Sequence, residues 1–544
     1  MRTVQQGRTW RLASLTAAVV AGAVTFPALA APVRVTLSPV IVQAGSAAAA
    51  HAAVNASIAL NGGVGSVSLE LPLVNGVLAS LSSVEISQLT ASYAVTQDAT
   101  VLTAIAMGKG TPPPPPPAPV NVFPQVTGAT AVRAAGNSGQ GVGVAVIDTG
   151  IASLPDFSGR LKPGVDLSGE NNPNLDSFGH GTFIAGLVAG NGASSAGAYV
   201  GEAPGADLFP IKVAGKSGST SVSTLIRALQ WIKDNPANIR VINMSVGAIP
   251  PGPTALNPLD QAVETMWRAG FVIVASAGNN GSARGTITAP GDDPLVITVG
   301  ATDDKHTVTS TDDTVATFSS NGPTASDAWW KPDLLAPGKS VVSVIPNTSV
   351  IWTNNRSARI GTTNFIGSGT SFATAITSGA AAMLVTENPA VSPDSVKAAL
   401  LTTTQAGPSP PQDPFAQGHG VLDIAKAIAE PVLSMVQDVS AIAPPALGTP
   451  IPLLSRQVVS TWATVTPAEQ LLYPLPYPFP YSGPATTALD PGNFSPLFQS
   501  SSWNSSSWNS SSWNSSSWNS SSWNSSSWNS SSWNSSSWNS SSWN

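Results

Sequence analysis

Apolar runs and helically spaced apolar residues alternate through the middle of the chain. Runs rich in Val and Ile predict five buried strands, at Val142–Ile147, Leu208–Val213, Arg240–Met244, Val272–Ala275 and Leu295–Val299. Apolar residues at helical spacing between these runs predict helices at Ser221–Lys233 and Leu259–Ala269. Strands that alternate with helices predict a mainly parallel sheet covered by helices, a three-layer α/β/α fold. The stretch spans about 300 residues, enough to bury a sizeable core.

The ends of three predicted elements carry polar residues. Asp148 directly follows the first of these strands. His180 precedes a small-residue helix, Phe183–Ala189, and Ser371 follows a glycine-rich turn and precedes the helix Phe372–Leu384. Side chains at the ends of rigid elements can be aimed into a cleft with a fixed geometry. We therefore examine these three residues as a candidate site.

A Ser, a His and an Asp placed in this way fit nucleophilic catalysis. A serine hydroxyl becomes a good nucleophile when a base takes its proton, and an imidazole is suited to that task. His180 is the candidate base, and Asp148 is the candidate carboxylate that fixes the tautomer of the imidazole. Each block alone also fits a structural turn or a helix cap. The ordered set of three predicts a serine protease with Ser371 as its nucleophile.

The remaining histidines are less suited to act as the base. His51 lies in a segment that we expect to be removed, His306 lies in a polar loop, and His419 lies in a turn where a packing role is expected. The oxyanion of a tetrahedral intermediate needs fixed hydrogen-bond donors. Asn279 follows the fourth predicted strand, so its side chain is the candidate donor, together with the N–H of Ser371.

The blocks around Asp148, His180 and Ser371 resemble those of the subtilases, the subtilisin family of serine proteases, across residues 121–430. Three further blocks match: Asn243-Met244-Ser245-Val246-Gly247, Ser319-Ser320-Asn321-Gly322-Pro323 and Leu335-Ala336-Pro337-Gly338. The resemblance implies a subtilisin-like fold and a serine endopeptidase that cuts peptide bonds through an acyl-enzyme. It also implies that substrate binds to Ser245, Val246, Gly247, Ala277 and Gly278.

Two positions depart from the family pattern. Phe372 and the residues after it replace the family's Met-Ala-x-Pro-His, and Phe183 stands where many relatives carry a second His. Neither belongs to the triad, so we expect different packing around the helix and no loss of activity. The expected pocket walls are small and uncharged, and Thr288 partly fills the pocket base. This composition favours apolar over basic side chains before the scissile bond.

Residues 1–30 are typical of a signal peptide. Arg2, Arg8 and Arg11 precede the apolar run Leu12–Phe26, and small residues end the segment. An uncleaved membrane anchor is the alternative. A secreted or cell-surface protein is therefore predicted, and without cysteine it has no disulfide bonds. The net charge of −6 argues against nucleic acid as a partner.

Residues 31–110 resemble the prosegments that precede subtilase domains. Val74–Leu81 is the best local match, and Val84–Leu89 and Val95–Val101 predict a helix and a strand of a small α+β unit. The resemblance implies a prosegment that helps the next domain to fold and inhibits its cleft. An unrelated small α+β domain is the alternative.

Pro-rich linkers flank the predicted peptidase domain of residues 121–430. Residues 111–120 contain six consecutive prolines, which favour a stiff, extended spacer. Residues 431–500 are also rich in proline. Cleavage between Leu102 and Pro124 would produce the mature N-terminus.

Residues 501–544 repeat Ser-Ser-Ser-Trp-Asn without a charged residue. A Trp at every fifth position matches neither a helix face nor a strand face, so we predict a disordered tail. Aromatic rings can stack on sugars or on another tail, which makes cell-wall glycan and self-association candidate interactions. A repeat expansion without a function is the alternative. For the whole chain, the alternative function is a cell-surface binding protein with a catalytically silent subtilisin-like scaffold and this tail for attachment.

The expected chemistry requires no cofactor. Its expected partners are protein or peptide substrates and the chain's own prosegment. Structural calcium is common in the family, but the loop Asn191–Gly201 has no carboxylate. Calcium is therefore left unassigned to any residue.

Overall fold

A computed structural model describes residues 36–102 and 120–430, except 311, 406 and 408–412. The predicted signal peptide, the repeat tail and the Pro-rich linkers, apart from Val120, lie outside the described residues. In the described part of the chain, no helix combines the length and the apolar character that a bilayer crossing needs.

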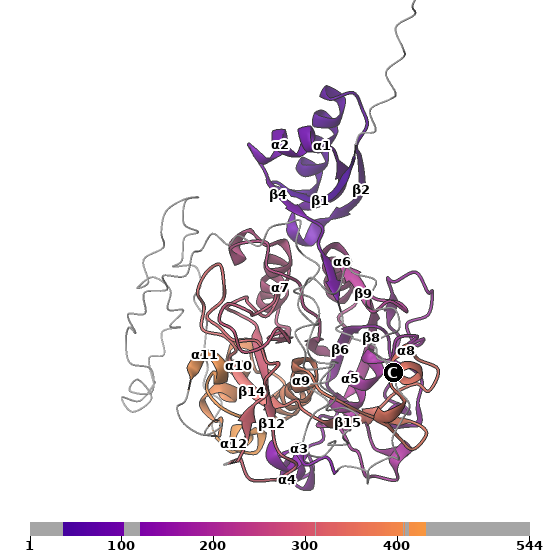
Figure 1. Cartoon of the computed structure of the whole chain (residues 1–544), viewed down its shortest axis with the longest axis vertical. Coiled ribbons are helices and arrows are strands. Elements are labelled where there is room, and N and C mark those ends of the chain that lie inside the picture. Colours follow the sequence, from indigo (N-terminus) through magenta and orange to yellow (C-terminus); the bar gives the residue numbers. More distant parts are fainter. Residues whose placement is uncertain (1–35, 103–119, 311, 406, 408–412, 431–544) are drawn as a thin grey trace, which may run out of the picture. The chain divides into compact units, whose positions relative to one another are not determined.

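The centre of the larger domain is an eight-stranded sheet (Figure 1). Its strand order is β13 (Thr314–Val315), β12 (Ile297–Asp303), β11 (Val272–Ser276), β10 (Ile239–Met244), β6 (Gly143–Asp148), β8 (Asp207–Lys212) and β7 (Val165–Asp166), with β14 (Leu334–Pro337) paired to β12. Neighbouring strands are parallel except β12 and β13, which run antiparallel. Each of the five predicted strands overlaps an observed one, so the mainly parallel sheet is confirmed.

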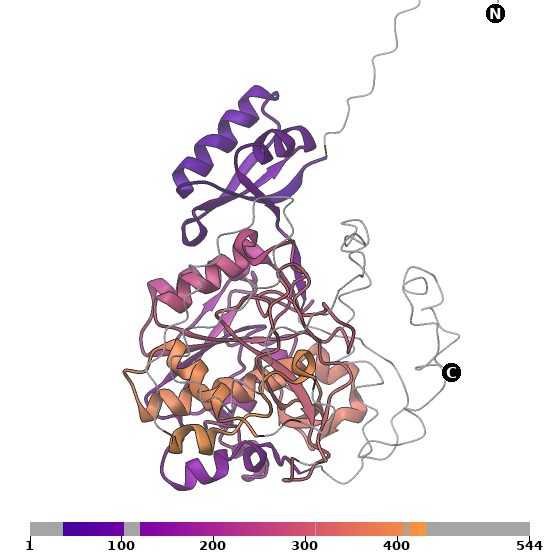
Figure 2. The same cartoon turned by 90° about the vertical axis from the view of Figure 1, so that its left-hand side faces the viewer.

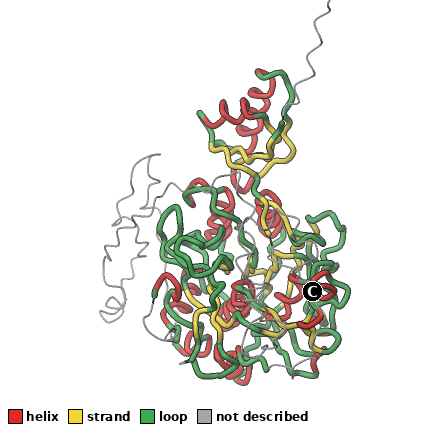
Figure 3. The backbone as a smooth tube through the Cα atoms, viewed as in Figure 1, coloured by secondary structure: helices red, strands yellow, loops and turns green. Residues whose placement is uncertain are grey.

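Helices cover both faces of this sheet (Figure 3). Helices α5 (His180–Ala189) and α9 (Thr370–Glu387) pack against each other, and α9 lies over β10, β11 and β12. Helices α6 (Val222–Asp234) and α7 (Pro258–Arg268) also pack together. A Cβ atom on Gly379 of α9 would lie 2.6 Å from the Cβ of Glu202, so this helix needs small residues for its close packing. The predicted helices are confirmed, and α5 begins three residues earlier than expected.

Shorter elements complete the larger domain. They are α3 (Phe123–Val126), α4 (Ala129–Ala134), α8 (Val350–Asn354), α10 (Pro393–Thr402), α11 (Pro414–Gln417), α12 (Ile424–Ala429), and a small antiparallel sheet of β15 (Val341–Val344), β17 (Asn364–Gly367) and β16 (Arg359–Ile360).

The order of the strands creates a switch point in the sheet. From β6 the chain first adds β8 on one side and then adds β10, β11 and β12 on the other side. In open α/β sheets, ligands bind outside the carboxyl ends of the strands at the point where the order reverses. Asp148 ends β6, and Ser245 follows β10 at the same edge. The fold therefore brings these two sequence blocks together.

Residues 38–102 form the N-terminal α+β region (Figure 2). An antiparallel sheet has the order β2 (Ser66–Leu71), β3 (Gly76–Leu81), β1 (Ser38–Gln43) and β4 (Ala94–Gln97), and helices α1 (Ala47–Leu60) and α2 (Ser83–Thr90) pack against each other and the sheet. Buried Val42, Val54 and Leu81 belong to a separate apolar core. Ser82 and Glu85 form a capping box at the start of α2.

The prediction of one continuous strand at Val95–Val101 is wrong. The chain forms β4, which pairs with β1, and then β5 (Thr100–Leu102), which pairs antiparallel with β9 (Ser219–Ser221) of the larger domain. The carboxylate of Asp98 lies between the two strands and accepts hydrogen bonds from Ser223 N (2.8 Å) and Oγ (2.7 Å). This bond at the start of α6 breaks the strand and directs its second half to a different partner.

A buried ammonium group fixes the chain just before β12. Lys397 Nζ donates to the carbonyl oxygens of Pro294 (2.8 Å), Leu295 (3.2 Å) and Val296 (3.0 Å). Asp333 lies 3.3 Å from it and 2.7 Å from Lys331 Nζ. Burial lowers the pKa of Lys397 to about 8, although the charge of Asp333 opposes this change.

Three buried carboxyl groups lie around the start of α7. Both oxygens of Asp260, and one oxygen each of Asp292 and Asp293, have no hydrogen-bond partner among the described residues. Burial, with the charges of Asp292 and Asp293, raises the pKa of Asp260 well above its usual 3.8. Burial raises the pKa of Asp292 to about 7. The folded state therefore favours the protonated forms.

These raised pKa values predict a loss of stability at alkaline pH. Carboxyl groups with a higher pKa in the folded state stabilise the fold fully below pH 3.8. This contribution is lost as the pH rises through about 7 for Asp292, and as it rises through the raised pKa of Asp260. Asp260→Asn removes one ionisable member of the cluster. In an inactive Ser371→Ala background, we expect it to increase stability by about 1–3 kcal/mol at pH 8 and by less at pH 5.

Thermal unfolding of the parent and the variant between pH 5 and pH 9 measures this difference. Asp234→Asn, at an exposed residue near the end of α6, is the control and is expected to leave the pH profile unchanged. Parallel melting profiles of the parent and Asp260→Asn across this range would contradict the prediction.

Candidate active site

Asp148 and His180 lie in direct contact. Asp148 is the last residue of β6, and His180 is the first residue of α5. The Nδ1 atom of His180 lies 2.8 and 2.9 Å from the two carboxylate oxygens of Asp148. An ionised carboxylate only accepts hydrogen bonds, so Nδ1 carries the proton and Nε2 is left as an acceptor. Both side chains are buried, at 0% and 2% exposure, which shields this bond from water.

Ser371 lies in the first turn of α9, and the residue after it lies near the same histidine. The ring of the following residue, Phe372, has its centroid 6.0 Å from that of His180. Ser371 Oγ donates to the carbonyl of Ser245 (3.2 Å), and Ser245 Oγ donates to the carbonyl of Ser371 (2.9 Å). This reciprocal pair ties the start of α9 to the loop after β10. Phe183 and Phe372, the two departures from the family pattern, pack together with centroids 4.5 Å apart.

The side chain of Asn279 is held by the residue before Ser371. Its Oδ1 accepts hydrogen bonds from Thr370 N (2.9 Å) and Oγ1 (3.0 Å). Because the oxygen faces Thr370, the NH₂ end of the amide is directed elsewhere and is the end that can donate. The N–H of Ser371 belongs to the first turn of α9, where N–H groups have no acceptor within the helix. These are the two donors that the sequence predicts for an oxyanion.

The predicted substrate-binding residues lie on two neighbouring loops. Ser245, Val246 and Gly247 follow β10, and Ala277 and Gly278 follow β11. Thr288 lies between the two loops, because its Oγ1 would be 2.7 Å from a Cβ atom on Gly247 and 2.9 Å from one on Gly278. Thr288 N also donates to the carbonyl of Ala277 (3.0 Å). Thr288 therefore lies against both loops, and the narrow, uncharged pocket expected from the sequence stays a prediction.

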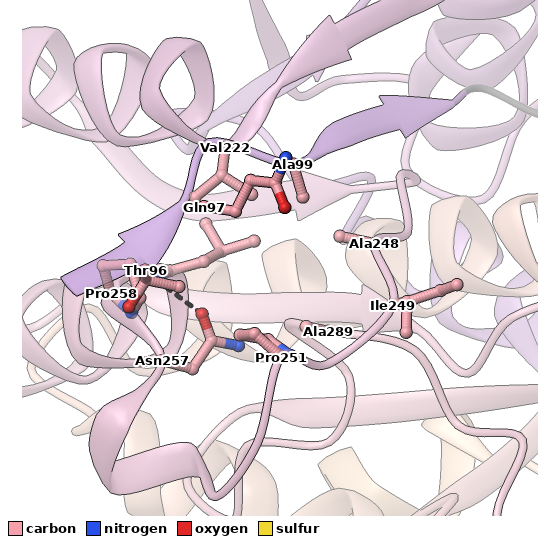
Figure 4. A pocket seen from close by; sticks show the side chains of 11 residues that line it. Thr96, Gln97, Ala99, Val222, Ala248, Ile249, Pro251, Asn257, Pro258 and Ala289 are labelled. Carbon is pink, nitrogen blue, oxygen red and sulfur yellow. Dashed lines mark hydrogen bonds between the residues drawn. The ribbon is translucent and has the colours of Figure 1, made fainter. Parts of the chain in front are cut away.

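A small pocket lies beside these loops (Figure 4). Val222, Ala248 and Ile249 of the larger domain line it together with Thr96, Gln97 and Ala99 of the N-terminal α+β region. Ala248 also pairs with Ala289, through N–H to carbonyl bonds of 2.9 Å in both directions. The N-terminal α+β region therefore contacts the segment that leads away from Ser245–Gly247.

Several residues of the site were missed from the sequence. Thr370 orients Asn279, Asp176 bonds to the start of α5, and Lys212 bonds to the loop after β6. A lysine inside the apolar run Leu208–Val213 is a signal of a buried, paired charge. An Asp four residues before His180 is a signal of a helix start. Neither signal identifies the partner.

The other histidines lie away from this contact. His419 is buried, and its Nδ1 lies 3.0 Å from the carbonyl of Asp333. Burial lowers the pKa of its imidazole, which agrees with the expected packing role. His51 bonds to Glu70 in the N-terminal α+β region, and His306 lies on a turn with Asp304. Among the described residues, no group of three or more His, Asp or Glu side chains is arranged to hold a metal ion.

Comparison with known proteins identifies the family of this site. The model of the Subtilase family matches residues 139–420, which include all three candidate residues and more than half of the chain. The chain belongs to the subtilase family. Its relatives are serine proteases, and the predicted enzyme class is therefore confirmed.

Individual relatives of this subtilase agree with that assignment. Serine protease AprX of Bacillus subtilis is 42% identical over 298 residues, which cover 54% of this chain and 67% of the relative. Subtilisin DY of Bacillus licheniformis is 34% identical, over 55% of this chain and 95% of the relative. Fervidolysin of Fervidobacterium pennivorans, described as a keratinolytic enzyme related to subtilisin, is similar in structure with a TM-score of 0.57. That similarity covers 74% of this chain and 63% of fervidolysin at 22% identity, and it supports the fold alone.

The anchored amide of Asn279 leads to a prediction. Asn279→Ala in this subtilase is expected to lower kcat by about 10²–10³ and to leave KM nearly unchanged, because an oxyanion forms only in the transition state. Steady-state hydrolysis of a peptide p-nitroanilide measures both constants. Asn280→Ala is the control, since the amide of Asn280 bonds to the carbonyl of Thr286 instead. A rise in KM at constant kcat would contradict the prediction.

Proposed function

We propose that the chain is a secreted serine endopeptidase that acts through Asp148, His180 and Ser371. The observation that carries the proposal is the bond of His180 Nδ1 to both oxygens of Asp148, in a chain of the subtilase family where the residue after Ser371 lies near the same imidazole. In the neutral imidazole this bond places the proton on Nδ1, so Nε2 is the nitrogen that can accept the serine proton. Peptide hydrolysis by nucleophilic catalysis requires that state.

The proposed reaction has two halves. Ser371 Oγ attacks the carbonyl carbon of the scissile peptide, and its proton passes to His180 Nε2. The imidazolium then gives that proton to the leaving amine as the C–N bond breaks, which leaves an acyl-enzyme. Water then attacks the ester carbon and gives a proton to Nε2. The imidazolium returns that proton to Ser371 Oγ as the C–Oγ bond breaks, which releases the new carboxyl group and restores the serine. The carboxylate of Asp148 stabilises the imidazolium in both halves.

The amide of Asn279 and the N–H of Ser371 are the proposed oxyanion donors. The Oδ1 of Asn279 is already occupied by Thr370, so the NH₂ end does not need to reorient during the reaction. Donors that are fixed before the charge develops contribute more than mobile ones. The positive end of α9 also lies at this place, because Ser371 is in its first turn.

We also propose that the N-terminal α+β region is an inhibitory prosegment. Its last described strand, β5, pairs antiparallel with β9 in a two-stranded sheet, and Val101 of β5 is fully buried in the main core. Addition of an extended peptide to a sheet edge is a common mode of peptide binding. Cleavage after Leu102 would separate this region from the peptidase domain.

The remaining expectations concern segments beyond the described residues. A signal peptide at residues 1–30 and attachment through the repeat tail of residues 501–544, to cell-wall glycan or to another tail, remain predictions. The alternative of a silent scaffold that only binds a surface is disfavoured by the intact contact between Asp148 and His180. Calcium also remains unassigned.

Replacement of the nucleophile tests the proposed function. Wild type and Ser371→Ala are both expressed from Ala31, and we expect only the wild type to release the N-terminal α+β region and to cut unfolded casein. Mass spectrometry of the released fragment would locate the cleaved bond. Ser378→Ala, a second buried serine of α9, is the matched control and is expected to retain both activities. Cleavage by folded Ser371→Ala would refute the assignment of the nucleophile.

The small, uncharged residues expected to line the substrate pocket, Gly247 and Gly278 among them, predict a preference for apolar residues. Among peptides that differ only in the residue before the scissile bond, we expect Leu to give a higher kcat/KM than Arg. Thr288→Ala removes atoms that lie against both glycines, and it is expected to raise kcat/KM for Phe relative to Ala by about tenfold. Equal rates for Leu and Arg peptides would show that the pocket lies elsewhere.

A further inference from the structure

The residues on either side of the Asp148–His180 bond are joined by a second set of bonds. Thr149 follows Asp148, and its Oγ1 accepts the N–H of Gly181, which follows His180 (2.8 Å). The same hydroxyl donates to Asp176 Oδ1 (2.8 Å). Thr149 is fully buried, so its hydroxyl satisfies both its donor and its acceptor capacity within the protein.

The carboxylate of Asp176 fixes the start of the helix that carries His180. Its Oδ1 accepts the N–H of Gly179 (2.7 Å), and its Oδ2 accepts the N–H of Thr182 (2.7 Å). The N-cap of α5 is Gly179, which has no side chain to bond to these groups. Asp176 therefore takes the capping role from outside the helix. Burial raises the pKa of this carboxyl group, and the bonds from Thr182, Gly179 and Thr149 oppose that rise.

The positively charged side chain of Lys212, in β8, bonds to the loop after β6 and to the loop before α5. Lys212 Nζ donates to the carbonyl oxygens of Thr149 (2.6 Å) and Leu175 (2.7 Å). Its side chain is fully buried and pairs with Glu170 at 3.1 Å. Burial opposes the ionisation of Glu170, but bonds from Ser177 and Lys212 and the lysine charge outweigh it and lower its pKa. One ammonium group thus holds a carbonyl from the loop after β6 and one from the loop before α5.

We propose that Thr149, Asp176 and Lys212, which we call the Thr149 clamp, are positioning residues that set the reactive geometry of Asp148 and His180. The inference rests on the proposed function. The three residues act through bonds to the backbone of the two segments that carry Asp148 and His180. The bonded backbone groups belong to Thr149, Leu175, Gly179, Gly181 and Thr182. Displacement of a reacting group by about 1 Å can cost 10²-fold in rate. Loss of the clamp should therefore lower kcat more than it changes KM.

The decisive comparison is Thr149→Val with Thr149→Ser. The valine has nearly the shape of threonine but neither donates nor accepts, whereas the serine keeps the hydroxyl. We expect the valine variant to lose about 10- to 100-fold in kcat at a nearly constant KM, and the serine variant to recover most of it. Asp176→Asn and Lys212→Met are expected to act in the same direction. Thr149→Val combined with Lys212→Met should lose less than the product of the single losses, because both break one unit.

The assay uses the full chain from Ala31. Each protein is refolded, and the first-order rate of its own cleavage is followed, which is a readout of the chemical step without a free substrate. After cleavage, phenylmethylsulfonyl fluoride titrates the active serines, and kcat and KM on a peptide p-nitroanilide are expressed per active site. Asp156→Asn is the matched control: Asp156 is fully buried and bonds to Ser194, away from the triad. Asp156→Asn is expected to lower the melting temperature and to leave kcat at the wild-type value.

The outcomes separate this inference from the proposed function. If Thr149→Val retains the wild-type kcat while its melting temperature falls, the residues serve stability alone and the inference is wrong. An equal loss of kcat in Asp156→Asn, or in Thr149→Ser, would overturn it as well. If the wild type neither cleaves itself nor reacts with phenylmethylsulfonyl fluoride at Ser371, the proposed function itself is wrong.

Discussion

The backbones of Gly150 and Gly181 pass so close that a methyl group on Gly181 would lie 2.2 Å from the carbonyl oxygen of Gly150. No larger residue fits this crossing without moving one of the two segments. The approach allows the carboxylate that ends β6 to reach the imidazole that begins α5 with two short contacts. The strand order of the sheet then brings the loop after β10, and with it Ser371, to the same edge. The site is thus a consequence of one backbone contact and one reversal of strand order.

Much of this arrangement could be predicted from the sequence. Asp148 and Asn279 follow apolar strands, His180 and Ser371 precede apolar helices, and these elements have strong patterns. The sheet, its main helices and the family follow from those local signals. The pattern does not determine where each element begins: α5 begins at His180 itself because Asp176 caps it from outside the helix.

Contacts between distant segments could not be predicted in the same way. The break between β4 and β5 depends on Ser223, which lies 125 residues after Asp98 in the chain. The role of Lys212 depends on two carbonyl groups, and a carbonyl has no sequence signature. The acidic residues at 260, 292 and 293 read as ordinary polar positions, yet the fold buries all three. Tertiary burial decides their ionisation, and periodicity contains no information about it.

The ammonium of Lys397 occupies a cage of three consecutive carbonyl oxygens with Asp333 beside it. Hard oxygen ligands of this kind also suit a free cation. A cation that is covalently part of the chain cannot be diluted away or captured by a chelator. Below its pKa of about 8, this junction therefore needs no cation from its surroundings.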